Sequence, residues 1–131
     1  MWRTHPRAIQ FVPRYALLRH TGAPDDPSGC HYDLLLEDGG SCRTWRLPRL
    51  PLHGGDDTLE ATPLPDHRRI WLDHRSAAVS GGRGWAERVM AGTYSGVLPT
   101  GSQLPVLVVL IDGDLQGTLR IQDGTCSLSR T

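Results

Sequence analysis

Turn-forming residues recur so closely along this chain that little room is left for a long helix. The 131 residues include 15 glycines and 10 prolines, and these separate short apolar runs. The clearest case is the apolar run of residues 104–111, which Asp112-Gly113-Asp114 turns back into a second run at residues 115–121. This pattern predicts an antiparallel hairpin.

Other short apolar runs predict further strands. The loop of residues 21–29 is dense in turn formers, and residues 38–41 have the composition of a turn between two strands. We expect strands at residues 11–18, 30–37, 42–47, 69–72, 104–111, 115–121 and 125–128, and at residues 85–94 a strand or one helical turn and then a strand. Residues 48–65 are expected to form an excursion outside the core. The fold class is therefore mostly β, a small β-barrel of short antiparallel strands with long loops and little helix.

The composition indicates one domain, residues 1–131, located in the cytoplasm. No stretch approaches the roughly 20 apolar residues of a membrane span, and the first residues lead into no secretory signal, so we expect no membrane partner. The 14 basic and 14 acidic residues cancel, so the net charge gives no indication of a polyanionic partner. Three scattered cysteines predict free thiols in a reducing compartment.

The predicted strand at residues 30–37 contains the strongest candidates for functional residues. Side chains alternate between the faces of a strand, so residues 32, 34 and 36 form an apolar face that fits a core. The opposite face carries His31, Asp33, Leu35 and Glu37.

His31 and Asp33 can both reach one metal ion, because alternate residues of a strand lie roughly 6 to 7 Å apart. Mixed nitrogen and oxygen ligands suit Mn, Zn or Fe better than Mg or Ca. His20 is a candidate third ligand, since the loop of residues 21–29 returns the chain to His31. The alternative is that this is an ordinary solvated strand face.

A second candidate is His67, which stands beside Arg68 and Arg69. An imidazole next to two guanidinium groups can act as a general acid or base, or can contact phosphate. A surface turn with solvated charges is the alternative. The loop of residues 81–84 could bind phosphate through its amides, but it lacks the lysine of a P-loop, and we interpret it as a turn.

In combination, the motifs of this chain resemble those of the 3′-phosphoesterase domain of bacterial DNA ligase D and its stand-alone relatives. The similarity keeps the order of landmarks over about residues 10–122. It begins at Arg19-His20 and continues through the HYDLLLE segment of residues 31–37, which is similar to HYDxRLE. Residues 44–48 are similar to the family's SWAVP, Asp66-His67 to its EDHP, residues 92–94 to its RGTW, and residues 110–121 to its closing hairpin.

The resemblance implies a β-barrel with a bound divalent metal, Mn²⁺ in the first place, with Zn²⁺ or another transition metal as alternatives. It implies the metal ligands His20, His31 and Asp33, and a catalytic group made of His31, Asp33 and His67. Phosphate would be bound by His67, Arg68, Arg69 and Trp71. The implied activity is DNA repair: removal of 3′-phosphates or 3′-ribonucleotides from DNA or DNA/RNA ends, with a repair ligase or polymerase as partner.

Several positions depart from the family's pattern. The family's arginine two residues after the aspartate is Leu35, and losing such a donor commonly costs orders of magnitude in rate. The family's tyrosine is Trp71, which cannot titrate like a phenol. Another arginine, among Arg68, Arg69, Arg75 and Arg83, is expected to substitute for the missing one. The rival hypotheses are a catalytically silent relative that binds nucleic-acid ends or a protein partner, and a small-ligand barrel with an unrelated metal.

Overall fold

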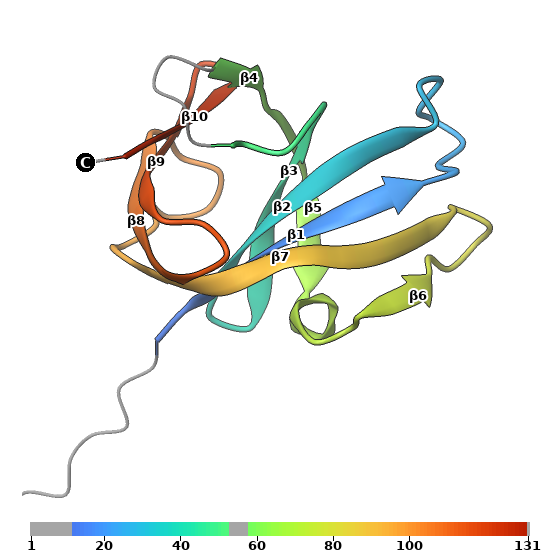
Figure 1. Ribbon diagram of the computed structural model, residues 1–131, viewed down its shortest axis with the longest axis horizontal. Helices are drawn as coiled ribbons and strands as arrows, with labels where there is room; N and C mark the ends of the chain where they lie inside the picture. Colours follow the sequence, from blue (N-terminus) through green and yellow to red (C-terminus); the bar gives the residue numbers. More distant parts are fainter. Residues whose placement is uncertain (1–11, 53–57, 131) are drawn as a thin grey trace, which may run out of the picture.

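Strands make up most of the protein, as the sequence predicts (Figure 1). The computed structural model describes residues 12–52 and 58–130. Within these ranges no helix is long and apolar enough to cross a membrane. The elements are β1 (Arg14–Thr21), β2 (Cys30–Asp38), β3 (Ser41–Leu47), β4 (Thr58–Glu60), β5 (Thr62–Arg68), the 3-10 helix η1 (Arg69–Leu72), β6 (Ser76–Ala78), β7 (Trp85–Ser95), β8 (Val106–Gly113), β9 (Gly117–Gln122) and β10 (Thr125–Ser129).

The strands form one antiparallel sheet in the order β4-β10-β9-β8-β7-β1-β2-β3-β5, with β6 paired to β7. Its two end strands, β4 and β5, follow one another in the sequence and are separated only by the buried Ala61. The sheet therefore curls back on itself through one bent segment, in which β4 pairs with β10 and β5 pairs with β3. The mostly-β fold class with antiparallel strands is confirmed, but the strands form a curved sheet and not a closed barrel. Among the described strands the hydrogen-bond ladder stops at β4 and β5, because the two halves of one bent segment do not pair with each other.

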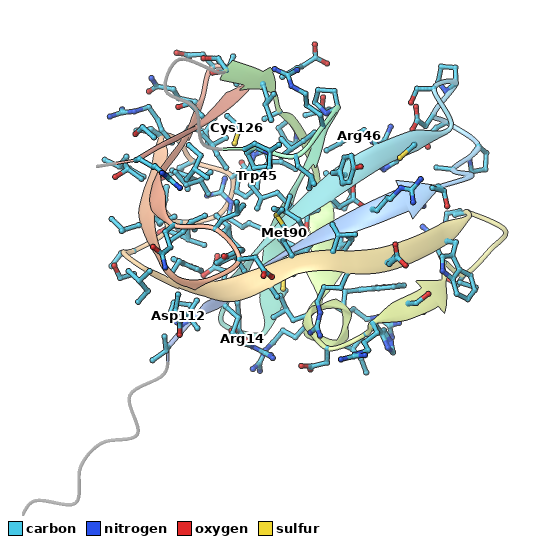
Figure 2. The ribbon with its side chains drawn as sticks, in the orientation of Figure 1. Arg14, Trp45, Arg46, Met90, Asp112 and Cys126 are labelled. Atoms are coloured by element: carbon cyan, nitrogen blue, oxygen red, sulfur yellow. The ribbon has the colours of Figure 1, made fainter. Side chains whose placement is uncertain are left out.

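The main apolar core lies on one face of the curved sheet. Leu34 and Leu36 of β2 belong to it, which confirms the apolar face predicted for that strand. Trp45 and Cys126 also point into this core (Figure 2). A smaller group, which we call the second apolar cluster, lies on the other face of β1 and β2. It consists of Ala16, Leu18, Leu35, Cys42, Leu72 and Ala86.

Three parts of the chain differ from expectation. The described part of the predicted excursion at residues 48–65 contains β4 and the start of β5. Pro63 and Pro65 fit β5 because it is an edge strand, where a missing N–H group leaves no ladder unpaired. Residues 69–72 form η1 instead of a strand, and its Leu72 packs into the second apolar cluster. The strand β6 was not predicted, because its three residues are too few to show an alternating pattern.

Candidate metal centre

The pairing of β1 with β2 places His20 directly opposite His31 and Leu18 opposite Asp33. Opposite residues of an antiparallel pair share a face. His20, His31 and Asp33, which we call the His–Asp cluster, therefore meet on the side of the sheet away from the main core. One ligand atom from each lies within 4.8 Å of the others. His31 and Asp33 are 3% and 2% exposed.

The carboxylate of Asp33 lies among three imidazole rings. Its Oδ1 is 3.2 Å from His31 Nε2, and its Oδ2 is 3.4 Å from His20 Nδ1 and 3.8 Å from His67 Nε2. Burial acts to raise the pKa of Asp33, but the neighbouring imidazole rings of His20, His31 and His67 outweigh it and hold that pKa well below its usual range. The nearby carboxylate of Asp33 in turn raises the pKa of His20, against desolvation and the positive charge of Arg46.

The outer nitrogens of both histidines are held by acceptors. His20 Nε2 donates to the carbonyl oxygen of Arg83 at 2.7 Å, and His31 Nδ1 lies 2.8 Å from Asp26 Oδ2. The hydroxyl of Ser28 and the ring of His31 lower the pKa of Asp26 to about 2, so Asp26 is an ionised acceptor. These contacts leave His20 Nδ1 and His31 Nε2 facing Asp33. Outer partners of this kind are typical of metal-binding histidines.

Two loops at one end of the sheet supply these outer partners (Figure 1). Asp26 lies in the β1–β2 loop and Arg83 in the β6–β7 loop. At Gly84 the backbone has a φ of +95°, and a Cβ there would overlap the carbonyl oxygen of Thr21. Only glycine allows this close approach, which brings the carbonyl of Arg83 within reach of His20.

The donor atoms of the His–Asp cluster fit a divalent transition metal. His31 Nε2 and Asp33 Oδ1 are buried and have no hydrogen-bond partner within the described part of the chain, a condition that costs about 1 to 3 kcal/mol for a buried polar atom. A nitrogen lone pair facing a carboxylate oxygen is repulsive unless a proton or a metal cation lies between them. Two ligands about 2.1 Å from one tetrahedral ion stand about 3.4 Å apart, close to the 3.2 and 3.4 Å found for the two histidine–aspartate pairs. The cluster could thus hold one metal ion.

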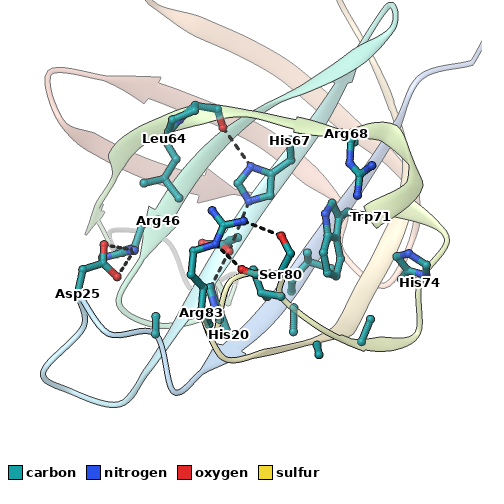
Figure 3. A pocket seen from close by; sticks show the side chains of 18 of the residues that line it. His20, Asp25, Arg46, Leu64, His67, Arg68, Trp71, His74, Ser80 and Arg83 are labelled. Atoms are coloured by element: carbon teal, nitrogen blue, oxygen red, sulfur yellow. Dashed lines mark hydrogen bonds and ion pairs between the residues drawn. The ribbon is translucent and has the colours of Figure 1, made fainter.

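A cavity of about 840 Å³ opens beside the His–Asp cluster and is lined by both His20 and Asp33. Its volume is within the range of small-ligand sites. Arg46 and Asp25 lie on one side of it and Arg68, Trp71 and His74 on the other (Figure 3). Its lining holds the three arginines Arg46, Arg68 and Arg83, the three histidines His20, His67 and His74, and the three aspartates Asp25, Asp33 and Asp66. The guanidinium and imidazole groups of this lining are donors that can bind an anionic ligand.

Most of the residues singled out from the sequence meet at this cavity. His67 donates from Nδ1 to the carbonyl oxygen of Pro65 at 3.0 Å, which leaves Nε2 facing Asp33. Trp71 lines the wall and packs edge-on against His74, with ring centres 5.2 Å apart. Arg68 also lines the cavity.

Arg69, expected to bind phosphate, is not among the cavity-lining residues. Its Nε and Nη2 atoms both lie 2.9 Å from Oε2 of Glu37. Glu37 is buried, and its charge requires cationic partners, which Arg14 and Arg69 supply. Arg69 thus compensates a buried carboxylate.

Three groups at the site were not predicted from the sequence: Arg46, Asp26 and the carbonyl group of Arg83. A signal for Arg46 was present: a two-residue turn at Gly39-Gly40 pairs Asp38 with Ser41, and counting back along the hairpin places Arg46 opposite Asp33. No comparable signal marks Asp26, whose contact depends on how the β1–β2 loop folds.

Leu35, the residue at the position of the expected arginine, is fully buried in the second apolar cluster. β2 therefore carries no arginine beside Asp33.

Comparison with known proteins found neither a matching family model nor a matching curated protein.

Proposed function

We propose that this chain is a metal-dependent phosphoesterase that processes 3′ ends of DNA, of the kind found in the 3′-phosphoesterase domain of DNA ligase D. The observation that carries the proposal is the pair of buried, unpartnered atoms, His31 Nε2 and Asp33 Oδ1, beside a cavity to whose lining three arginines and three histidines contribute. The first fits a cation and the second fits a phosphate. The order of sequence motifs supports the same activity.

His20, His31 and Asp33 would hold the metal, Mn²⁺ in the first place and Zn²⁺ as the alternative. A bound divalent ion would supply Lewis-acid chemistry, polarising a phosphate oxygen and lowering the pKa of water. Asp26 and the carbonyl of Arg83 fix the orientation of the two imidazole rings.

His67 would act on the scissile phosphate. Its Nδ1–H donates to the carbonyl of Pro65, so the ring would need a second proton, on Nε2, to donate to a phosphate oxygen or to pass a proton to the leaving oxygen. Arg68 and the indole N–H of Trp71 are additional donors from the cavity lining.

The substrate class would be DNA or DNA/RNA ends bearing a 3′-phosphate or a single 3′-ribonucleotide. Trimming such ends leaves a 3′-hydroxyl that can be extended or sealed, so the partner would be a repair polymerase or ligase of the cytoplasm.

A second candidate is a catalytically silent protein that binds the same ends. The burial of Leu35 in the second apolar cluster favours it, because a cation missing beside a reacting phosphate slows phosphoryl transfer strongly.

The test is end trimming on a primer–template duplex that carries a 3′-phosphate or one 3′-ribonucleotide, with and without Mn²⁺. The variants are His31→Ala and, as a matched control on the exposed face of β9, Arg120→Ala. Mn²⁺-dependent trimming that disappears only in His31→Ala supports the enzyme. Metal-loaded, folded protein that binds these ends without trimming them supports the silent candidate.

A further inference from the structure

Arg46 is the arginine that the sheet places beside Asp33. The two residues are directly opposite each other in the β2–β3 ladder, and side chains at such positions share a face with Cβ atoms about 5 Å apart. Arg46 lines the same cavity as Asp33 and His67, and its charge acts on His20. By contrast, Arg68 stands opposite Ser41, at the far end of β3.

The hydrogen bonding of Arg46 is incomplete. Its Nη2 lies 3.2 and 3.4 Å from the two carboxylate oxygens of Asp25. Its Nε is buried and finds no partner among the described residues. A guanidinium offers several N–H donors in a rigid fork that matches phosphate oxygens, and at least one of these donors is unused here.

The partner of Arg46 is easily displaced. Asp25 lies in the β1–β2 loop with 72% of its side chain exposed, while the Arg46 side chain is 25% exposed. An ion pair with a largely exposed carboxylate is weak. Arg83, the other arginine close to the His–Asp cluster, is held more firmly, because its Nε and Nη2 donate to Ser80 at 2.7 and 2.9 Å.

We propose that Arg46 is the main phosphate-binding residue of the cavity, and that Asp25 is a competing anion which the phosphate displaces. This inference rests on the proposed function, since it names the residue that would bind the 3′-phosphate. The neighbouring strand β3 thereby supplies the cation that Leu35 of β2 does not.

The experiment measures binding without turnover. A fluorescently labelled primer–template duplex ending in a 3′-phosphate, and the same duplex ending in a 3′-hydroxyl, are titrated with protein in EDTA and followed by anisotropy. The preference for the phosphorylated end is the readout, so catalytic activity is not required. Arg46→Ala, Arg46→Lys, Asp25→Asn and the control Arg120→Ala are compared with the wild type, and circular dichroism verifies that each is folded.

Arg46→Ala should weaken binding of the phosphorylated end by about tenfold to a hundredfold and leave the hydroxyl end nearly unchanged, as expected for one charge-assisted contact. Arg46→Lys should recover part of the loss. Asp25→Asn should strengthen binding of the phosphorylated end by about two- to fivefold. Arg120→Ala should behave as wild type.

The proposal is overturned if Arg46→Ala keeps the wild-type preference for the phosphorylated end, if it weakens both ends equally, or if the wild type shows no preference. A different result would contradict the proposed function while leaving this inference intact. In that case the end preference depends on Arg46, yet the wild type trims neither substrate in Mn²⁺.

Discussion

The ring of His31 is held from the side opposite Asp33 by a single carboxylate, Asp26, at 2.8 Å. The contact joins the β1–β2 loop to β2, so the loop determines which nitrogen of His31 faces Asp33. A metal site at the His–Asp cluster therefore depends on a residue that touches no metal.

Replacing Asp26 with asparagine should lower the affinity for a divalent metal by about tenfold to a hundredfold, the usual loss when such an outer partner is changed. The measurement is a competition titration of Zn²⁺ or Mn²⁺ against a chromophoric chelator. Asp25→Asn is the matched control, because Asp25 lies in the same loop and pairs with Arg46 instead of His31. Equal affinities of the Asp26→Asn variant and the wild type would show that the contact does not orient His31.

The extent to which the site was predictable follows from loop lengths. The β2–β3 turn is short, so its register could be counted, and Arg46 lies where the count places it. The β1–β2 loop spans residues 22–29, and a loop of that length leaves the register open. The pairing of His20 with His31 was therefore only a hypothesis before the fold was known.

The fold was predictable where alternation was clear and was not where the backbone bends. The β8–β9 hairpin follows from two apolar runs around a glycine turn. The corner at Ala61 does not, because prolines surround it and suggest a loop. An edge strand tolerates those prolines, which sequence patterns alone do not reveal.

Arg69→Ala should reduce stability and leave end binding unchanged. The substitution removes two contacts to the buried carboxylate of Glu37 but leaves Arg14, which is only partly exposed. We expect a loss of about 1 to 2 kcal/mol in the free energy of unfolding, measured by urea denaturation. Anisotropy with the 3′-phosphorylated duplex provides the second readout. A variant of full stability that binds phosphorylated ends poorly would restore Arg69 to the phosphate-binding group.

Tyr15→Phe should lower the free energy of unfolding, because it removes the hydrogen bonds that link β1 to the β8–β9 turn. The hydroxyl of Tyr15 donates to the carbonyl of Leu115 at 3.0 Å and accepts from its N–H at 2.8 Å. Removing it leaves two buried backbone groups without partners, at a cost of about 1 to 3 kcal/mol. Tyr32→Phe, a half-buried tyrosine, is the control. If urea unfolding gives similar midpoints for the two variants, the bridge to Leu115 contributes little.

Two buried thiols should make the protein sensitive to alkali. Burial raises the pKa of Cys42 to about 11 and that of Cys126 to about 12, above the ordinary value of 9.0. A raised folded-state pKa means that the neutral thiol is favoured by folding. Its contribution is fully present below pH 9 and is lost as the pH rises toward 11 and 12. The free energy of unfolding should therefore fall over this interval.

Serine in place of both cysteines tests this origin, because it removes the titration without adding a large side chain. The double variant, less stable at neutral pH for lack of two apolar contacts, should lose less stability than the wild type between pH 9 and 11. Equal slopes for the two proteins would assign the alkaline loss to other groups. Alkylation by iodoacetamide at pH 8 should meanwhile modify Cys30 and spare Cys42 and Cys126 until urea is added, because only Cys30 is partly exposed.

Metal binding should stabilise the folded protein through the His–Asp cluster. An ion that binds only the folded state adds about 2.7 kcal/mol when present at a hundred times its dissociation constant, and Mn²⁺ or Zn²⁺ should therefore raise the melting temperature by several degrees. His31→Ala removes one ligand and should abolish this increase. His74→Ala is the matched control, because His74 lines the same cavity but contacts Trp71 and not Asp33. A melting temperature that rises equally in all three proteins would place the metal elsewhere, whereas no rise in the wild type would mean that the unpartnered atoms of His31 and Asp33 are satisfied by a proton instead.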